Sequence, residues 1–119
     1  MDRVGFVNHK GKEVLVIDFS VAGKQELLQT MDAAKKIISG QPENSVLTLT
    51  KVAGSSFDSE VSKALKEYVK SNKPYVKSAA VVGLGGLQKI LYDTVINFTG
   101  RKMATFNNIE EAMDWLVKQ

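Results

Sequence analysis

The sequence predicts an α/β protein with a single mixed, mostly parallel five-stranded sheet, four helices and an N-terminal β-hairpin. Three observations support this fold class. Short β-branched runs alternate with segments whose apolar residues recur at helical spacing. Strands that alternate with helices of this length imply right-handed crossovers and parallel pairing. The first two strands are separated only by a short polar turn with a glycine, so they are expected to pair antiparallel.

The N-terminal half contains three expected strands and one helix. Arg3 to Val7 and Glu13 to Phe19 are predicted strands, and Asn8 to Lys12 is the turn between them. Gly23 to Ser39 is a predicted helix, because its apolar residues share one face and a proline soon follows its last residue. Val46 to Thr50 is the third strand. Each segment is bounded by glycine, proline or small polar residues, which favours a break in regular structure there.

The C-terminal half repeats the alternation. Helical spacing covers Phe57 to Ser71, a buried strand covers Tyr75 to Val82, and an apolar helix is expected over Leu87 to Thr99, with a glycine at position 100 as its C-terminal cap. Met103 to Phe106 is the last strand. Asn108 is expected to cap the final helix. The inward face of that helix is expected to carry Ile109, Ala112, Met113 and Leu116.

Composition excludes several classes of protein. The chain has 119 residues, two prolines, no cysteine and a net charge of +3, so we expect one globular domain over residues 1–119. Without cysteine there is no disulfide framework, thiolate metal site or cysteine nucleophile. No apolar run is long enough to span a membrane, and no signal peptide is recognisable at the N-terminus. The expected location is therefore cytoplasmic.

Positive charge is concentrated in the middle of the chain. Residues 61–102 carry eight basic and two acidic side chains, for a net charge of +6. Such a region could attract nucleic acid, anionic lipid or an acidic partner, or it could simply be a solvated helix face. Only Arg3 and Arg101 are arginines. Because bidentate base and phosphate contacts favour arginine, no specific nucleic-acid recognition is expected.

The C-terminal third resembles a known family. The strand Ala79 to Gly83, which reads AAVVG, leads through a helix to a short strand and then to Phe106 to Leu116, which reads FNNIEEAMDWL. This arrangement resembles the STAS family (sulfate transporter and anti-sigma factor antagonist), in particular its SpoIIAA-like branch of small stand-alone proteins. The resemblance implies a regulatory or protein-interaction domain. The fold is also similar to lipid-carrier domains of the CRAL-TRIO type.

A loop with hydroxyl groups follows the third strand. In phospho-regulated STAS domains this loop carries an Asp-Ser-Ser/Thr-Gly motif, whose hydroxyl is phosphorylated by a partner kinase. The corresponding segment here, Val52 to Asp58, has the hydroxyls but not that residue order. One reading is that Ser55 or Ser56 caps the next helix. The other is a phospho-acceptor, for which Ser56 is the expected residue, because a phosphate at a helix N-terminus meets a favourable dipole.

Catalytic chemistry is not expected. The only histidine, His9, falls in the predicted hairpin turn, where an exposed side chain is the ordinary outcome. A nucleophile–base pair or a Cys/His metal site would need a second histidine or a cysteine. Asp18 and Asp58 are the one plausible carboxylate pair, but Asp18 more naturally caps a turn. We therefore expect no catalytic residues, no metal and no cofactor.

Several polar and glycine residues are predicted to meet at one rim of the sheet. Ligands of open α/β sheets collect outside the carboxyl ends of the strands. The Gly83 to Gly86 turn could allow a helix to pack closely or allow an anion or ligand to approach. The residues expected at the rim are Asp18, Ser20, Thr50, Ser55, Ser56, Gly83 and Gly85.

The apolar helix over 87–99 has hydrophobic residues beyond its expected core face. Ile90 is expected on that core face, whereas Tyr92 and Ile96 lie outside it, one turn apart. This pair is expected to be partly exposed and to form an interaction surface, unless neighbouring segments cover it. The predicted function is a non-enzymatic interaction domain with a protein partner or self-association. The alternative is a carrier of a small apolar, lipid or anionic ligand, with a pocket near the Gly83 to Gly86 loop.

Overall fold

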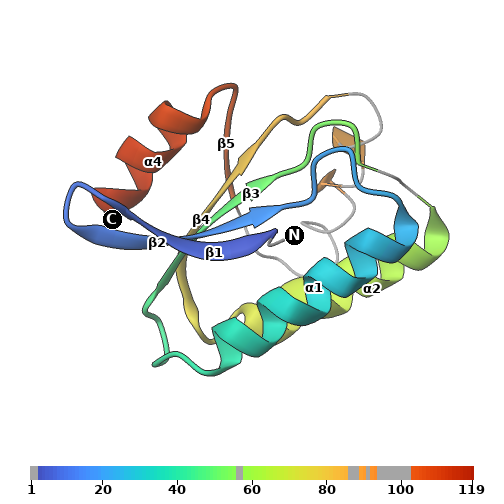
Figure 1. Ribbon diagram of the computed structural model, residues 1–119, viewed down its shortest axis with the longest axis horizontal. Coiled ribbons are helices and arrows are strands. Elements are labelled where there is room, and N and C mark those ends of the chain that lie inside the picture. Colours follow the sequence, from blue (N-terminus) through green and yellow to red (C-terminus); the bar gives the residue numbers. More distant parts are fainter. Residues whose placement is uncertain (1–2, 56–57, 86–88, 91, 94–102) are drawn as a thin grey trace.

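The computed structural model describes residues 3–55, 58–85, 89–90, 92–93 and 103–119. Its sheet has five strands in the order β1-β2-β3-β4-β5, with β1 and β2 antiparallel and the other pairs parallel (Figure 1). This confirms the predicted mixed, mostly parallel sheet. The strands are β1 (Val4–His9), β2 (Lys12–Asp18), β3 (Val46–Lys51), β4 (Val76–Val82) and β5 (Ala104–Phe106).

The described residues contain three helices rather than the four expected. They are α1 (Lys24–Ser39), α2 (Ser59–Asn72) and α4 (Ile109–Val117). Most of the fourth expected helix, 87–99, and its expected cap at position 100 lie outside the described residues. Within that span, the described residues 89–90 and 92–93 are helical.

The hairpin between β1 and β2 is tighter than the predicted five-residue turn. His9 pairs with Lys12, so the loop is only Lys10 and Gly11, whose φ angles are 52° and 87°. Two positive φ angles in a two-residue loop define a type I′ turn, whose twist matches that of the flanking strands. The side chain of Asn8 accepts a hydrogen bond from the amide of Gly11 at 3.2 Å. The strands therefore extend through His9 and begin again at Lys12.

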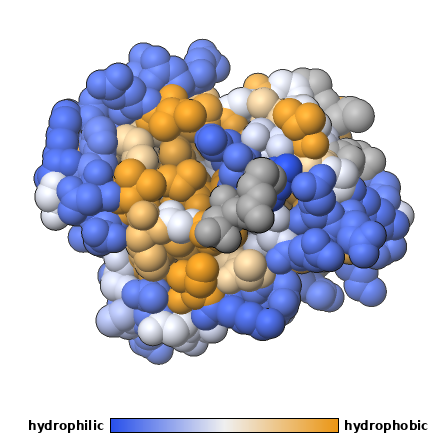
Figure 2. All heavy atoms as spheres, viewed as in Figure 1, coloured by the Kyte–Doolittle hydropathy of each residue, from blue (hydrophilic) through white to orange (hydrophobic). Residues whose placement is uncertain are grey.

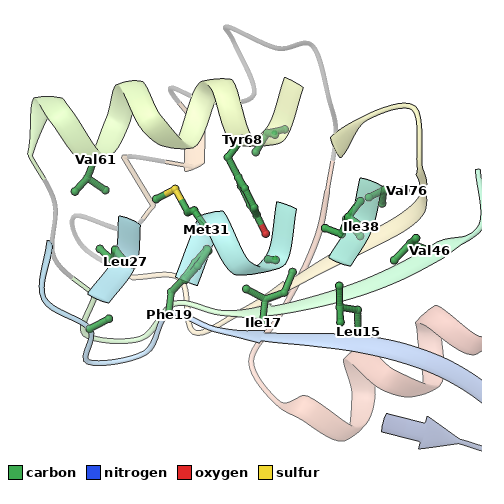
Figure 3. Packing of buried hydrophobic residues seen from close by; sticks show 14 residues of the cluster. Leu15, Ile17, Phe19, Leu27, Met31, Ile38, Val46, Val61, Tyr68 and Val76 are labelled. Atoms are coloured by element: carbon green, nitrogen blue, oxygen red, sulfur yellow. The ribbon is translucent and has the colours of Figure 1, made fainter. Parts of the chain in front are cut away.

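The helices cover the two faces of the sheet unequally. Right-handed crossovers that always advance toward the next strand place successive helices on the same face. Accordingly α1 and α2 lie side by side on one face, and α4 lies on the other (Figure 1). The larger core lies under α1 and α2, where Tyr68 extends from α2 toward the strands beside Met31 and Phe19 (Figure 3). The smaller core lies under α4 and includes Val14, Leu49, Ala80, Ala112, Met113 and Leu116.

Two details at helix ends differ from the sequence-based expectation. The N-cap of α2 is Asp58, whose carboxylate accepts a hydrogen bond from the Val61 amide at 2.8 Å, so the cap is neither Ser55 nor Ser56. A carboxylate at this position also interacts favourably with the helix dipole. Asn108 caps α4 as predicted, through the amide of Glu111 at 2.9 Å. Ile109, however, is 44% exposed and does not belong to the inward face.

Candidate functional site

Three loops meet at the carboxyl ends of β2, β3 and β4. We call the loops 19–22, 52–55 and 83–85 the rim. Backbone hydrogen bonds join them: the amide of Val21 donates to the carbonyl of Ala53 at 2.8 Å, and the amide of Val52 donates to the carbonyl of Val82 at 3.0 Å. The predicted convergence of polar and glycine residues at this edge is therefore present for the described residues. Ser56 lies outside them.

Asp18 organises one end of the rim. Its carboxylate accepts hydrogen bonds from the Ser20 amide, at 2.9 Å, and from the Ser20 hydroxyl. The Lys51 ammonium lies 3.7 Å away, and Arg3 donates to the backbone carbonyls of Asp18 and Ser20. Partial burial raises the pKa of Asp18, but the hydrogen bonds from Ser20 and the charges of Lys51 and Arg3 outweigh burial and lower it overall. The carboxylate therefore holds a turn, as predicted.

Asp58, the other acid considered for catalysis, also serves local structure. Besides capping α2, its carboxylate lies 3.3 Å from the ammonium of Lys24, which also reaches Glu60 at 2.8 Å. The hydrogen bond from the Val61 amide is the main influence that lowers the pKa of Asp58. An acid whose pKa is held down by structural hydrogen bonds is poorly suited to donate a proton near neutral pH. Both carboxylates therefore have local structural roles, at the Asp18–Ser20 turn and at the α2 N-terminus.

Val21 is the most exposed large hydrophobic residue described, and its backbone is strained. Its side chain is 78% exposed and its φ angle is +54°. The residue is the third of a tight turn closed by the Ala22 amide on the Phe19 carbonyl at 3.2 Å. Such a turn favours glycine or asparagine at that position, and a β-branched residue there is a genuine outlier. Sequence reasoning missed Val21, because nothing in the pattern distinguishes it from an ordinary loop residue.

Gly83 allows two rim loops to approach each other closely. Its φ angle is +91°, and a Cβ atom at this position would lie 2.9 Å from the Cβ of Ala53. A side chain is therefore excluded both by backbone conformation and by space. Gly85 differs, since a Cβ atom there would meet nothing within 4 Å. The close approach at Gly83 is to Ala53 of a neighbouring loop, and most of the helix expected to pack after the glycine turn lies outside the described residues.

An apolar cavity of about 80 Å³ lies directly beneath the rim. Phe19 and Ser55 line it from the rim loops, Thr50 lines it from the end of β3, and Tyr68 lines it from α2. The rings of Phe19 and Tyr68 contact each other edge to face, with centroids 6.0 Å apart. Leu84 also lines the cavity. The cavity therefore lies near the glycine turn, where the sequence suggested a pocket.

Tyr68, whose ring lines the cavity, carries a buried hydroxyl group. Its side chain is buried, and its hydroxyl has no hydrogen-bond partner within 3.5 Å. Burial raises the pKa of Tyr68, and the nearby amide side chain of Asn72 offsets this only in part. A buried hydroxyl without a partner costs free energy.

The predicted interaction pair is only partly placed. Tyr92 is half-buried, lines the cavity and donates a hydrogen bond from its hydroxyl to the Met103 carbonyl. Ile96 lies outside the described residues. Ile90, which was expected on the core face, is instead 56% exposed, so that expectation is wrong. Among the described residues of this segment, Tyr92 rather than Ile90 faces the interior.

His9 is not the exposed turn residue that the sequence predicted. It ends β1, its side chain is only 23% exposed, and its Nε2 lies 2.8 Å from the carboxylate of Asp114 in α4. Lys10 reaches the same carboxylate oxygen at 2.8 Å. The hydrogen bonds from His9 and Lys10 lower the pKa of Asp114 to about 2. The cluster joins the hairpin to the C-terminal helix, across 105 residues of sequence.

The described residues contain no candidate metal site and no candidate membrane-spanning helix. No group of three or more histidine, aspartate or glutamate side chains within 3–55, 58–85 and 103–119, or among the four described residues between, could hold a metal ion. In that same part of the chain, no helix combines the length and apolar character needed to cross a membrane.

Comparison with known proteins supports the fold. No protein-family model matches the chain, and no curated protein matches it. Among solved structures, the chain is similar to an uncharacterised protein from the DUF3478 family of Shewanella loihica PV-4 that has a SpoIIAA-like fold. The TM-score is 0.73 at 16% sequence identity, over 95% of this chain and 91% of that one. The chain therefore has the SpoIIAA-like fold that the resemblance to STAS domains implied.

Proposed function

We propose that this chain is a non-enzymatic STAS-like interaction domain that binds a protein partner at the rim. The single observation that carries this proposal is Val21, which combines a strained backbone with a fully presented apolar side chain. Strain of this kind persists only where the surrounding structure enforces it, and it is concentrated at functional positions. Here the hydrogen bond from the Val21 amide to Ala53 and the Asp18–Ser20 turn enforce it.

The surroundings of Val21 suit a protein partner better than chemistry. Ala53 and Gly54 are exposed beside it on the rim, so these neighbours present backbone and a small side chain to a partner. The nearby carboxylate of Asp18 is fully engaged by Ser20 and lies beside Lys51. The exposed side chain of Val21 would lose apolar surface to water if a partner covered it, and such burial favours binding.

The test compares rim and non-rim variants in a quantitative pull-down from the native host. Val21→Asp should abolish retention of a specific partner, whereas Ile109→Asp, an equally drastic change at an exposed apolar residue of α4, should leave retention unchanged. The partner is then purified and its affinity for both variants is measured by titration. Equal binding by wild type and Val21→Asp refutes the rim as the interaction site.

The cavity favours a second candidate function, the carriage of a small apolar ligand. Its walls are apolar. Its volume of about 80 Å³ is below the roughly 300–1,000 Å³ of ordinary ligand sites. The cavity as described therefore suits an apolar ligand of a few heavy atoms rather than a lipid chain.

Native mass spectrometry of the purified protein tests this second candidate. A retained small molecule should add a constant mass that is lost on denaturation. A wild-type mass equal to the sequence mass in native spectra would rule out carriage of a tightly held ligand.

A further inference from the structure

The two edges of the sheet are very different. One edge is β5, with three residues, and short edge strands protect a sheet against unwanted pairing. The other is β1, whose six residues read VGFVNH. Natural edge strands are usually blunted by proline, charge or a bulge. β1 has no proline and no charged side chain apart from the titratable His9, and its register with β2 is continuous.

The backbone groups that β1 turns outward follow from its pairing with β2. The Asp18 amide donates to the Arg3 carbonyl at 2.7 Å, so these two form a hydrogen-bonded pair of the antiparallel ladder. Hydrogen-bonded and non-hydrogen-bonded pairs alternate along such a ladder. The amides and carbonyls of Val4, Phe6 and Asn8 therefore point away from β2, toward the free edge.

The side chains of β1 leave apolar surface on both faces. Side chains alternate between the two faces of a strand. Val4 packs on the core beneath α1 and α2, so Phe6 lies on that face of the sheet. His9 contacts α4, so Val7 lies on the opposite face. Phe6 is 42% exposed and Val7 is 45% exposed. Figure 2, in the same view as Figure 1, shows hydrophobic residues at the surface where β1 crosses the sheet.

We propose that β1 is a self-association edge, at which β1 of a second copy adds antiparallel and joins two sheets into one. A two-fold axis at Phe6 sets Phe6 opposite its own copy and Val4 opposite Asn8 of the other copy. These are the residues whose backbone groups point outward, so each pair can exchange two hydrogen bonds. A single register thus gives hydrogen-bond partners to the outward backbone groups of β1 in both copies. This is the self-complementarity that a two-fold interface requires.

The side chains fit the same register. Gly5 falls opposite Val7 of the second copy, and a Cβ atom at Gly5 would meet nothing within 4 Å, so the valine has room over the glycine. On the other face the two Phe6 rings lie against each other, an arrangement that stabilises cross-strand pairs. Asn8 of the second copy lies beside Val4, next to an open groove of about 460 Å³ between β1 and α1 that Glu26 and Gln29 line with polar groups.

Sedimentation velocity over about 1 μM to 1 mM tests the proposal. The wild type should show a concentration-dependent monomer–dimer equilibrium. Phe6→Lys should raise the dissociation constant at least tenfold, because a lysine on each copy would meet its like charge across the axis. Gly5→Thr should do the same by filling the space over the glycine, while its β-branched side chain favours the strand within each monomer.

Controls separate this edge from other surfaces and from unfolding. Val21→Lys, at the exposed rim residue, should dimerise like the wild type, and circular dichroism should be the same for all variants. If Phe6→Lys is unfolded, Gly5→Thr alone decides the result. A wild type that stays monomeric up to 1 mM overturns the proposal, and the β1 edge would then be a candidate site for a strand of another protein. Dimerisation that is unaffected by Gly5→Thr, or abolished by Val21→Lys, also overturns it.

Discussion

Replacing Val21 by glycine should stabilise this protein, although the change removes a side chain. A non-glycine residue held in the left-handed region costs about 1–3 kcal/mol. Glycine adopts the +54° φ angle of Val21 freely, but it adds about 0.5–1 kcal/mol of unfolded-state entropy. Because the side chain is 78% exposed, little buried apolar area is lost. The net gain in the free energy of unfolding is therefore about 1 kcal/mol.

Urea denaturation with an unchanged m-value measures this gain, and the melting temperature should rise by roughly 3–6 °C. Val7→Gly is the matched control, since it removes the same side chain from a strand residue and should destabilise. The measurements are made below the concentration at which the chain associates. A Val21→Gly variant no more stable than the wild type would refute strain at this position. If the rim proposal holds, the stabilised variant also binds the partner more weakly.

Three further changes test individual contacts. Gly83→Ala should lower the free energy of unfolding by about 2–4 kcal/mol, because it adds backbone strain and a clash with Ala53. Gly85→Ala, the control, should change it by no more than about 0.5 kcal/mol. Equal effects of the two substitutions in urea titrations would contradict the close approach of Gly83 to Ala53. Asp58→Ala should lower the free energy of unfolding by about 1 kcal/mol, because it removes the N-cap of α2. An unchanged free energy of unfolding would show that this cap does not stabilise the protein. Asp114 has a folded pKa of about 2, below its unfolded value, so its stabilisation is complete above about pH 4 and lost as the pH falls to 2. The stability difference between wild type and Asp114→Asn should therefore shrink over that range, and a constant difference in urea titrations at each pH would argue against the contact.

The sequence was sufficient to predict the sheet because its signals are local. Alternation, β-branched runs and glycine or proline breaks lie within a few residues of what they determine, so the five strands were placed to within two residues at each end. The hairpin was predicted too long because a lysine occupies the first left-handed position, where asparagine, aspartate or glycine is usual.

Contacts between distant segments could not be predicted in this way. His9 is half-buried because Asp114 meets it across the whole length of the chain, and no spacing rule connects them. Asp58, and not one of the two serines expected, is the N-cap of α2. Its carboxylate lies beside Lys24 of α1, a contact between distant segments that the local sequence does not reveal. The rim was predicted as a set because parallel strands end together, but the conformation of Val21 within it depends on backbone bonds between loops.

The strand order also has a consequence for how the chain folds. Every strand pairs only with strands adjacent to it in sequence, so no strand has to be inserted between two that are already paired. During synthesis the hairpin can form first, and each later strand can then join the growing edge as it emerges. The last strand to join, β5, has only three residues and one neighbour. Hydrogen exchange should therefore be fastest in β5 and slowest in β3, which is paired on both sides and almost wholly buried.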